Sequence, residues 1–167
     1  MPTFKRRWPD LEPSDDAIAV RRVASSAIAA VRRQVTAASL SREAMKAPIW
    51  SLTQRRGLVT SGMIVVYHDR PDIMLINGSA GITVDIGLKV DSAFHGDSML
   101  QSLATPAGRV AWARYQGPYA MLPVIHTDIR AWCIDRGHRI TGLCWDHYSH
   151  WHEEPERRVT EVYYQLA

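Results

Sequence analysis

The feature that most constrains the fold of this chain is an internal repeat. The dipeptide Arg-Gly at 56–57 is followed five residues later by Gly62 and a predicted strand, and the same dipeptide at 136–137 is followed five residues later by Gly142 and another predicted strand. Both halves have the order strand, helix, strand, strand. One such unit leaves a face of its sheet in need of cover, so two units are expected to share a sheet edge or a core.

The repeat predicts an α+β fold. We expect two pseudo-twofold-related strand-helix-strand-strand units that form an antiparallel sheet with two helices and a central ligand pocket, because a concave seam between related halves is a natural place for a pocket. By the spacing of the motifs, Asp85 in the first half corresponds to Glu161 in the second. The first loop between paired strands is about four residues longer than the second.

Hydrophobic periodicity predicts the strands and the helix of the first half. Residues 17–35 alternate as an extended segment with a break at Ser25-Ser26, and a helix is predicted from Ser41 to Arg56. The segments GMIVVYHD at 62–69 and ITVDIGLKV at 82–90 are then two strands around a turn region.

The second half repeats this order. GRVAWARYQ at 108–116 is a strand, and a helix begins near Tyr119 or Ala120 and ends at Gly137. LCWDHYSHW at 143–151 and TEVYYQLA at 160–167 are the closing pair of strands. One side of the predicted helix is apolar and carries Leu122, Ile125, Ile129, Trp132 and Cys133.

Length and composition fit one globular domain. The chain has 167 residues, of which 46% are hydrophobic, and we expect a flexible leader at 1–15 followed by a single domain at 16–167 with half-repeats at about 16–92 and 105–167. No apolar run approaches the length of a membrane span, so no membrane association is expected. The only cysteines, Cys133 and Cys144, are too few for a disulfide framework, which predicts a cytoplasmic protein.

The basic charge does not predict a nucleic-acid-binding protein. The formal net charge is +3 and the sequence pI is about 9.1, but the arginines occur as doublets scattered along the whole chain. A DNA-binding protein usually concentrates its charge on one helix or face and carries a recognisable motif. Helix-turn-helix, zinc-finger and basic-zipper patterns are absent from the sequence, so direct nucleic-acid binding is not expected.

An acidic residue lies within the most aromatic stretch of the chain, GLCWDHYSHW at 142–151. Alternation along a strand places Asp146 and Tyr148 on one face, with Cys144, and places Trp145 and His147 on the other. Charged side chains are rarely buried without a partner, so Asp146 is the leading candidate for a functional residue. A structural alternative is that Asp146 pairs with an arginine or a tyrosine hydroxyl.

The segments PAGRVAWARYQGPYAML, IRAWCIDRG, GLCWDHYSHW and TEVYYQL resemble the gyrase-inhibitor-like (GyrI-like) small-molecule-binding family, which includes the effector-binding domains of multidrug-responsive transcription regulators. The resemblance is strongest over 105–166. It implies two duplicated strand-helix-strand-strand units and an aromatic pocket with an acidic floor for bulky, cationic or planar ligands. The family usually has glutamate at the position of Asp146, so the carboxylate here lies about 1.5 Å further back.

Other aromatic residues are further candidates for the wall of this pocket. They are Trp112, Tyr115, Tyr119, Trp145 and, at the corresponding place in the first half, Tyr67. For each of them a core position is the alternative. The histidines at 147, 150 and 152 are split between two faces and have no neighbouring ligand at metal-binding spacing, so neither a metal nor another cofactor is expected.

Two functions from different classes remain open on this basis. The first is a stand-alone small-molecule-binding protein for sensing, sequestration or resistance, in which Asp146 supplies charge and Tyr148 supplies contact area. The second is a hydrolase of strained electrophilic natural products such as cyclopropanoids, in which Asp146 is the general base and Tyr148 binds the substrate oxygen. The expected partner is a small molecule, and a separate regulator protein or a second copy of the chain is compatible with either function.

Overall fold

The computed structural model describes residues 18–36, 38–40, 42–43, 49–71 and 79–167. The predicted leader and the predicted start of the first helix at Ser41 lie outside these residues. In the described part of the chain, eight strands form one antiparallel sheet in the order β1-β6-β8-β7-β3-β4-β2-β5. The predicted α+β fold class is confirmed.

The strands and helices follow the predicted order, with one addition. The strands are β1 (Ile18–Val23), β2 (Ala27–Val35), β3 (Thr60–Tyr67), β4 (Ile82–Val90), β5 (Gln101–Ala104), β6 (Gly108–Gln116), β7 (Ile140–His150) and β8 (Val159–Leu166). The helices are α2 (Ile49–Arg55) and α4 (Leu122–Asp135), with short 3-10 turns η2 (Tyr119–Met121) and η3 (Pro155–Arg157). Strand β5 was not predicted from the sequence. Among the described helices, none has both the length and the apolar character needed to cross a membrane.

The glycines that define the sequence repeat have a conformational reason to recur. Gly57 and Gly137 follow the two helices with φ angles of 66° and 72°, and Gly62 and Gly142, each the third residue of the next strand, have φ angles of 112° and 106°. Residues with a Cβ rarely adopt these angles. The two halves therefore end a helix and begin a strand with the same backbone conformations.

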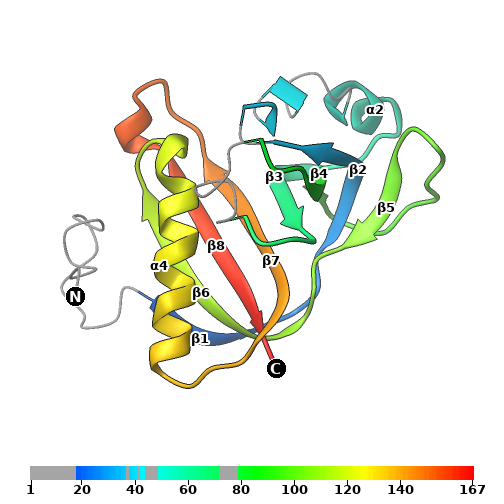
Figure 1. Ribbon diagram of the computed structural model, residues 1–167. Coiled ribbons are helices and arrows are strands. Elements are labelled where there is room, and N and C mark those ends of the chain that lie inside the picture. The colour runs from blue at the N-terminus through cyan, green and yellow to red at the C-terminus, as the bar shows by residue number, and fades with distance from the viewer. Residues whose placement is uncertain (1–17, 37, 41, 44–48, 72–78) are drawn as a thin grey trace.

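The two edges of the sheet belong to one long ribbon. β1 pairs with β6, and β2 pairs with β5, in one continuous register through the bends at 24–26 and 105–107. Because β1 and β5 are the two edge strands, this ribbon, made of residues 18–35 and 101–116, links both ends of the sheet. Figure 1 shows it as the blue and yellow-green strands that pass below the other strands.

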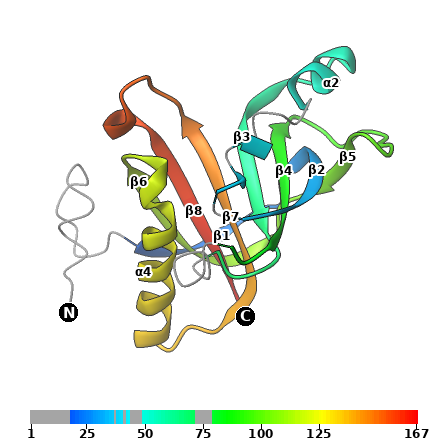
Figure 2. The ribbon, with the colours of Figure 1, turned by 45° about the horizontal axis from the view of Figure 1, so that its top comes forward.

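The helices cover one face of the sheet, which we call the helix face. α4 packs over the half formed by β6, β8 and β7, and α2 packs over β2 and β4, as Figures 1 and 2 show. The larger hydrophobic core lies between this face and the helices, with Ile125 and Ile129 of α4 fully buried. A smaller core lies on the opposite face, where Ile64 and Trp145 pack with residues of the ribbon. We call that side the ribbon face.

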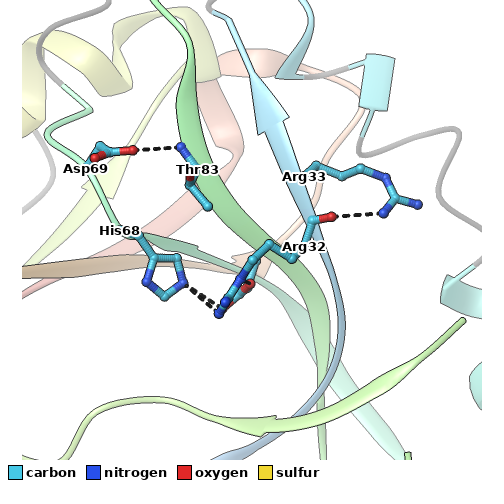
Figure 3. Close-up of polar contacts among 6 residues, drawn as sticks. Arg32, Arg33, His68, Asp69 and Thr83 are labelled. Atoms are coloured by element: carbon cyan, nitrogen blue, oxygen red, sulfur yellow. Dashed lines mark hydrogen bonds and ion pairs between the residues drawn. The ribbon is translucent and has the colours of Figure 1, made fainter. Parts of the chain in front are cut away.

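The acidic residues that correspond in the sequence repeat occupy similar positions in the sheet. Asp85 lies opposite Arg32 on the neighbouring strand, and Glu161 lies opposite Arg114. Asp85 Oδ1 accepts a hydrogen bond from Arg32 Nε at 2.8 Å, and Oδ2 accepts one from Arg32 Nη2 at 3.1 Å and lies 2.7 Å from His68 Nε2. Figure 3 shows Arg32 and His68 directed toward each other. Burial alone would raise the pKa of Asp85, but these partners outweigh it and hold that pKa below its ordinary value.

Candidate functional site

Strand β7 separates two groups of candidate residues onto opposite faces of the sheet. Cys144, Asp146 and Tyr148 face the larger core under the helices, and Trp145 belongs to the smaller core on the ribbon face. This is the alternation that the sequence predicts, because successive side chains of a strand point to opposite faces. Asp146 has no exposed surface.

Two side chains face the carboxylate of Asp146. The hydroxyl of Tyr67, on the neighbouring strand β3, donates a hydrogen bond of 2.9 Å to Oδ2. His126 Nε2, from helix α4, lies 2.8 Å from Oδ1, but the contact does not have hydrogen-bond geometry, and neither atom has a hydrogen-bond partner among the described residues. One oxygen of the carboxylate is therefore held firmly, and the other faces an imidazole without a directed bond.

His126 connects the carboxylate to a third strand. Its Nδ1 is 2.8 Å from the hydroxyl of Tyr164 on β8, and its ring packs edge-on against Tyr67 and Tyr164 with centroid distances of 5.3 and 5.4 Å. A neutral imidazole has one donor and one acceptor nitrogen, so the arrangement fits a hydroxyl that donates to Nδ1 and an Nε2–H that faces Asp146. Residues from β3, β7, β8 and α4 thus form one buried polar group.

Tyr67 and Tyr148 stay protonated. Burial raises the pKa of Tyr67 and of Tyr148 above the ordinary value, and the negative charge of Asp146 raises both further. Their hydroxyls therefore remain hydrogen-bond donors at physiological pH. A third buried hydroxyl, that of Thr160 on β8, has no hydrogen-bond partner among the described residues.

A line of aromatic rings runs from the solvent toward this buried group. The ring of Tyr119 in η2 packs edge-on against Tyr148 with a centroid distance of 5.1 Å. The guanidinium of Arg158 lies 4.9 Å from the ring centroid of Tyr119 and 5.8 Å from that of Trp151. Trp151 is 63% exposed, so the line reaches the surface.

The structure divides the aromatic residues predicted for the pocket into two sets. Tyr67, Tyr119 and Tyr148 lie with Asp146 on the helix face, and Tyr115 is buried on the same face, where its hydroxyl donates to Pro118 O at 3.1 Å. Trp112 and Trp145 lie on the ribbon face. There Trp112 Nε1 donates to Glu161 at 3.0 Å, and Trp145 stacks on Tyr163 with a centroid distance of 5.0 Å and an interplanar angle of 4°.

Sequence reasoning missed His126 and Tyr164. A signal for His126 was present, since it lies on the apolar stripe of the second helix between Leu122 and Ile129 and is 1% exposed. A histidine on such a stripe needs a buried partner. Tyr164 gave no comparable signal, because aromatic residues are frequent on strands for packing reasons alone.

The described residues contain no group of three or more His, Cys, Asp or Glu side chains placed to hold a metal ion. Hollows are found at two other places: one of about 190 Å³ on the ribbon face, and a wide one of about 600 Å³ beside Arg32 and Phe94. Neither hollow includes Asp146. In this structure, the carboxylate is covered by its own neighbours.

Comparison with known proteins identifies one family. The family model described as the GyrI-like small molecule binding domain matches residues 20–167. No curated protein matches the chain in sequence. Among solved structures, the C-terminal domain of EcmrR has a TM-score of 0.74 at 16% identity, with 90% of this chain and 96% of that domain covered. This chain spans 56% of the EcmrR chain in the structure of its DNA complex.

Two further solved structures share the fold. A hydrolase from Listeria innocua has a TM-score of 0.60 at 12% identity, with 90% of this chain and 91% of that chain covered. The protein SAV2435, solved with tetraphenylphosphonium bound, has a TM-score of 0.57 at 9% identity, with 90% of this chain and 93% of that chain covered. At these identities the likeness concerns the fold alone.

Proposed function

Because the chain belongs to the GyrI-like small-molecule-binding domain family, we propose that it binds a bulky hydrophobic compound, cationic or planar and aromatic, on the helix face around Asp146. The protein would sense or sequester such a compound, or provide resistance to it. The observation that carries the proposal is a carboxylate without exposed surface, surrounded by Tyr67, Tyr148 and His126.

The physical basis is the cost of a buried charge. An ionised carboxylate in an apolar interior is stable only if it is paired or hydrogen-bonded. Tyr67 satisfies Oδ2 of Asp146, whereas Oδ1 has no directed hydrogen bond. An organic cation near Oδ1 would supply the missing charge, and each ring face turned toward it would add about 0.5–2 kcal/mol of cation–π attraction.

The unsatisfied polar atoms support the same location. In the part of the chain that the structure describes, the buried side-chain atoms without a hydrogen-bond partner are Asp146 Oδ1, His126 Nε2 and Thr160 Oγ1. All three side chains belong to elements that meet on the helix face. Native proteins leave few buried polar groups unpaired, so such a cluster is typical of a place that a ligand or water completes.

A ligand can reach Asp146 only after covering side chains move. Tyr119 lies against Tyr148, and Arg158 lies over Tyr119 and Trp151, so contacts between these residues lead from Tyr148 to the solvent. The bound tetraphenylphosphonium of SAV2435 supports a lipophilic cation as the first probe, since that protein shares this fold.

A hydrolase is the second candidate function, and the observation that favours it is the position of His126 Nε2, 2.8 Å from Asp146 Oδ1. In this reaction, a water molecule would lose a proton to Asp146 as its oxygen forms a bond to an electrophilic ring carbon of the substrate. The ring bond would break, and its electron pair would take up a proton in turn. Tyr148, protonated and partly buried on the same face, would donate a hydrogen bond to the substrate oxygen.

The deciding experiment compares the wild-type protein with Asp146→Asn. Titration calorimetry would measure the binding of tetraphenylphosphonium, of tetraphenylborate, an anion of the same shape, and of neutral triphenylphosphine oxide. We expect the substitution to weaken binding of the phosphonium by about tenfold or more, which is about 1.4 kcal/mol, and to change binding of the neutral compound little. Equal losses for the cation and the neutral compound would contradict the electrostatic role of Asp146.

The same two proteins distinguish the hydrolase. Mass spectrometry would follow a panel of strained electrophiles over time. A mass gain of one water with the wild-type protein, absent with Asp146→Asn, would show hydrolysis with Asp146 as base. Electrophiles that stay intact with both proteins would contradict this second function. A variant that only melts at a lower temperature and keeps its ligand binding would show that Asp146 is structural.

A further inference from the structure

A hollow of about 190 Å³ lies on the ribbon face, on the other side of the sheet from Asp146. Its floor is formed by side chains of the central strands, among them Ile64, Trp145 and Tyr163. Its roof is the bend of the ribbon at Ser26 and Thr105. The hollow therefore lies where the ribbon crosses the sheet, between segments that are far apart in the sequence.

The floor of the hollow includes a stacked aromatic pair on neighbouring strands. Trp145 and Tyr163 are stacked with their ring planes 4° apart and Trp145 is 4% exposed. The hydroxyl of Tyr163 donates a hydrogen bond of 2.5 Å to Glu161, and Trp112 donates to the same oxygen at 3.0 Å. Tyr163 is therefore held by its hydroxyl and Trp145 by stacking, so the aromatic part of the hollow is preformed, which lowers the cost of ordering side chains on binding.

The roof is also fixed by hydrogen bonds. Thr105 N donates to Ser26 O at 2.9 Å, Ser26 N donates to Thr105 Oγ1 at 2.9 Å, and Ser25 Oγ donates to Thr105 O at 2.7 Å. The bend of the ribbon is therefore a cross-linked turn over the sheet. The space below it is bounded by rigid elements on both sides.

A basic side chain lines this space without a partner of its own. Lys89 of β4 is partly buried, and among the described residues no hydrogen bond or ion pair involves its ammonium group. His147 also lines the hollow, with its ring packed over Gly62 and its Nε2 placed 3.1 Å from Ser61 O. The ammonium group of Lys89 is therefore available to an anion that enters the hollow.

The nearby acidic groups do not compensate Lys89. Glu161 accepts hydrogen bonds from Tyr163 and Trp112; burial alone would raise its pKa, but these bonds outweigh it and hold the pKa below its ordinary value. Asp85 is likewise occupied by Arg32 and His68. The hollow therefore combines a stacked aromatic pair with a lysine that has no hydrogen-bond or ion-pair partner among the described residues.

We propose that this hollow is a second ligand site, for a small planar organic anion such as a single-ring aryl carboxylate. The carboxylate would pair with the Lys89 ammonium, and the ring would lie against Trp145 and Tyr163. At about 30 Å³ per water molecule, the hollow holds the equivalent of about six waters. It suits one ring better than the drug-sized compounds that occupy pockets of about 300–1,000 Å³. The two sites thus differ in size and in the sign of the charge they select.

The test measures binding of benzoate, benzamide and benzylammonium to the full chain by calorimetry. The three probes share a ring and differ in charge. We expect benzoate to bind with a dissociation constant of about 1 mM or lower, and the other two to bind about tenfold or more weakly. Lys89→Met should weaken benzoate binding by about tenfold. The matched control is Arg22→Gln, which removes one positive charge from an exposed position on β1.

The outcomes separate this site from the one around Asp146. Asp146→Asn should leave benzoate binding unchanged, since the sheet lies between the two places. Benzoate that binds no better than benzylammonium would overturn the proposal, and so would equal effects of Lys89→Met and Arg22→Gln. Circular dichroism of each variant would check that it is folded, and Lys89→Gln, a polar replacement, repeats the test if Lys89→Met is not.

Discussion

Removal of the Tyr67 hydroxyl tests how the buried carboxylate is held. In Tyr67→Phe the ring stays in its edge-on contact with His126, and the substitution removes the 2.9 Å hydrogen bond to Asp146 Oδ2 together with the hydroxyl's hydrogen bond with Tyr148. Asp146 has no exposed surface, so water cannot replace the donor without a rearrangement. Hydrogen bonds to charged groups contribute about 1.5–3 kcal/mol to stability, and we expect the free energy of unfolding to fall by this amount.

Urea and thermal denaturation would measure this loss. A domain of this length loses about 2–4 °C of melting temperature per kcal/mol, so the midpoint of Tyr67→Phe should fall by about 3–12 °C. A double-mutant cycle with Asp146→Asn would isolate the interaction between the two side chains. Because the groups are in direct contact, the coupling energy should be about 1 kcal/mol or more.

Tyr115→Phe is the matched control. It also removes one hydroxyl from a buried tyrosine on the helix face, but the acceptor, Pro118 O, is a neutral carbonyl. Neutral hydrogen bonds contribute about 0.5–1.5 kcal/mol, so the control should lose less stability than Tyr67→Phe. If the two variants lose the same amount and the coupling energy with Asp146 is near zero, the carboxylate does not depend on Tyr67, and the reasoning is wrong.

Two further predictions follow from other contacts. Asp85→Asn should lower the free energy of unfolding at neutral pH by about 1.5–3 kcal/mol. The folded-state pKa of Asp85 lies below the ordinary 3.8, so the difference in unfolding free energy between wild type and variant should persist above pH 3.8. It should vanish as the pH falls through the lowered folded-state pKa. Urea denaturation at several pH values would measure it. Arg158→Gln removes the cation over Tyr119 and should tighten tetraphenylphosphonium binding by about two- to thirtyfold, the equivalent of one cation–π contact. The neighbouring exposed Arg157→Gln is the control; equal titration curves for the two variants would show that Arg158 does not compete with the ligand.

The local elements of this fold could be predicted because they depend on local geometry. The alternation of a strand is independent of its partners, so Asp146 and Tyr148 were assigned to one face and Trp145 to the other before any pairing was known. The end of α4 followed from Gly137, whose φ angle of 72° suits glycine. The repeat of Arg-Gly and Gly motifs likewise reflects backbone angles that recur in both halves.

The candidate sites depend on contacts between elements, which the hydrophobic periodicity of a single helix or strand does not predict. His126 is fixed on the buried stripe of α4 by its sequence position, but its contact with Asp146 depends on how α4 lies over β7. The tryptophans expected in the pocket with Asp146 lie on the other side of the sheet. From sequence alone, each tryptophan could be assigned to one face of its own strand. Which side chains of the neighbouring strands lie on that same face could not be predicted.

The sequence by itself determined the α+β class, the duplicated order of elements and the face on which each side chain of β7 lies. These properties follow from propensity, glycine conformation and a period of two, all of which act over a few residues. The pairing of β1 and β2 with β6 and β5 as one ribbon, and the hollow that this ribbon closes beside Lys89, depend on long-range packing. The partners in these contacts are far apart along the chain, and they are selected by the packing of the whole sheet, which no local pattern encodes.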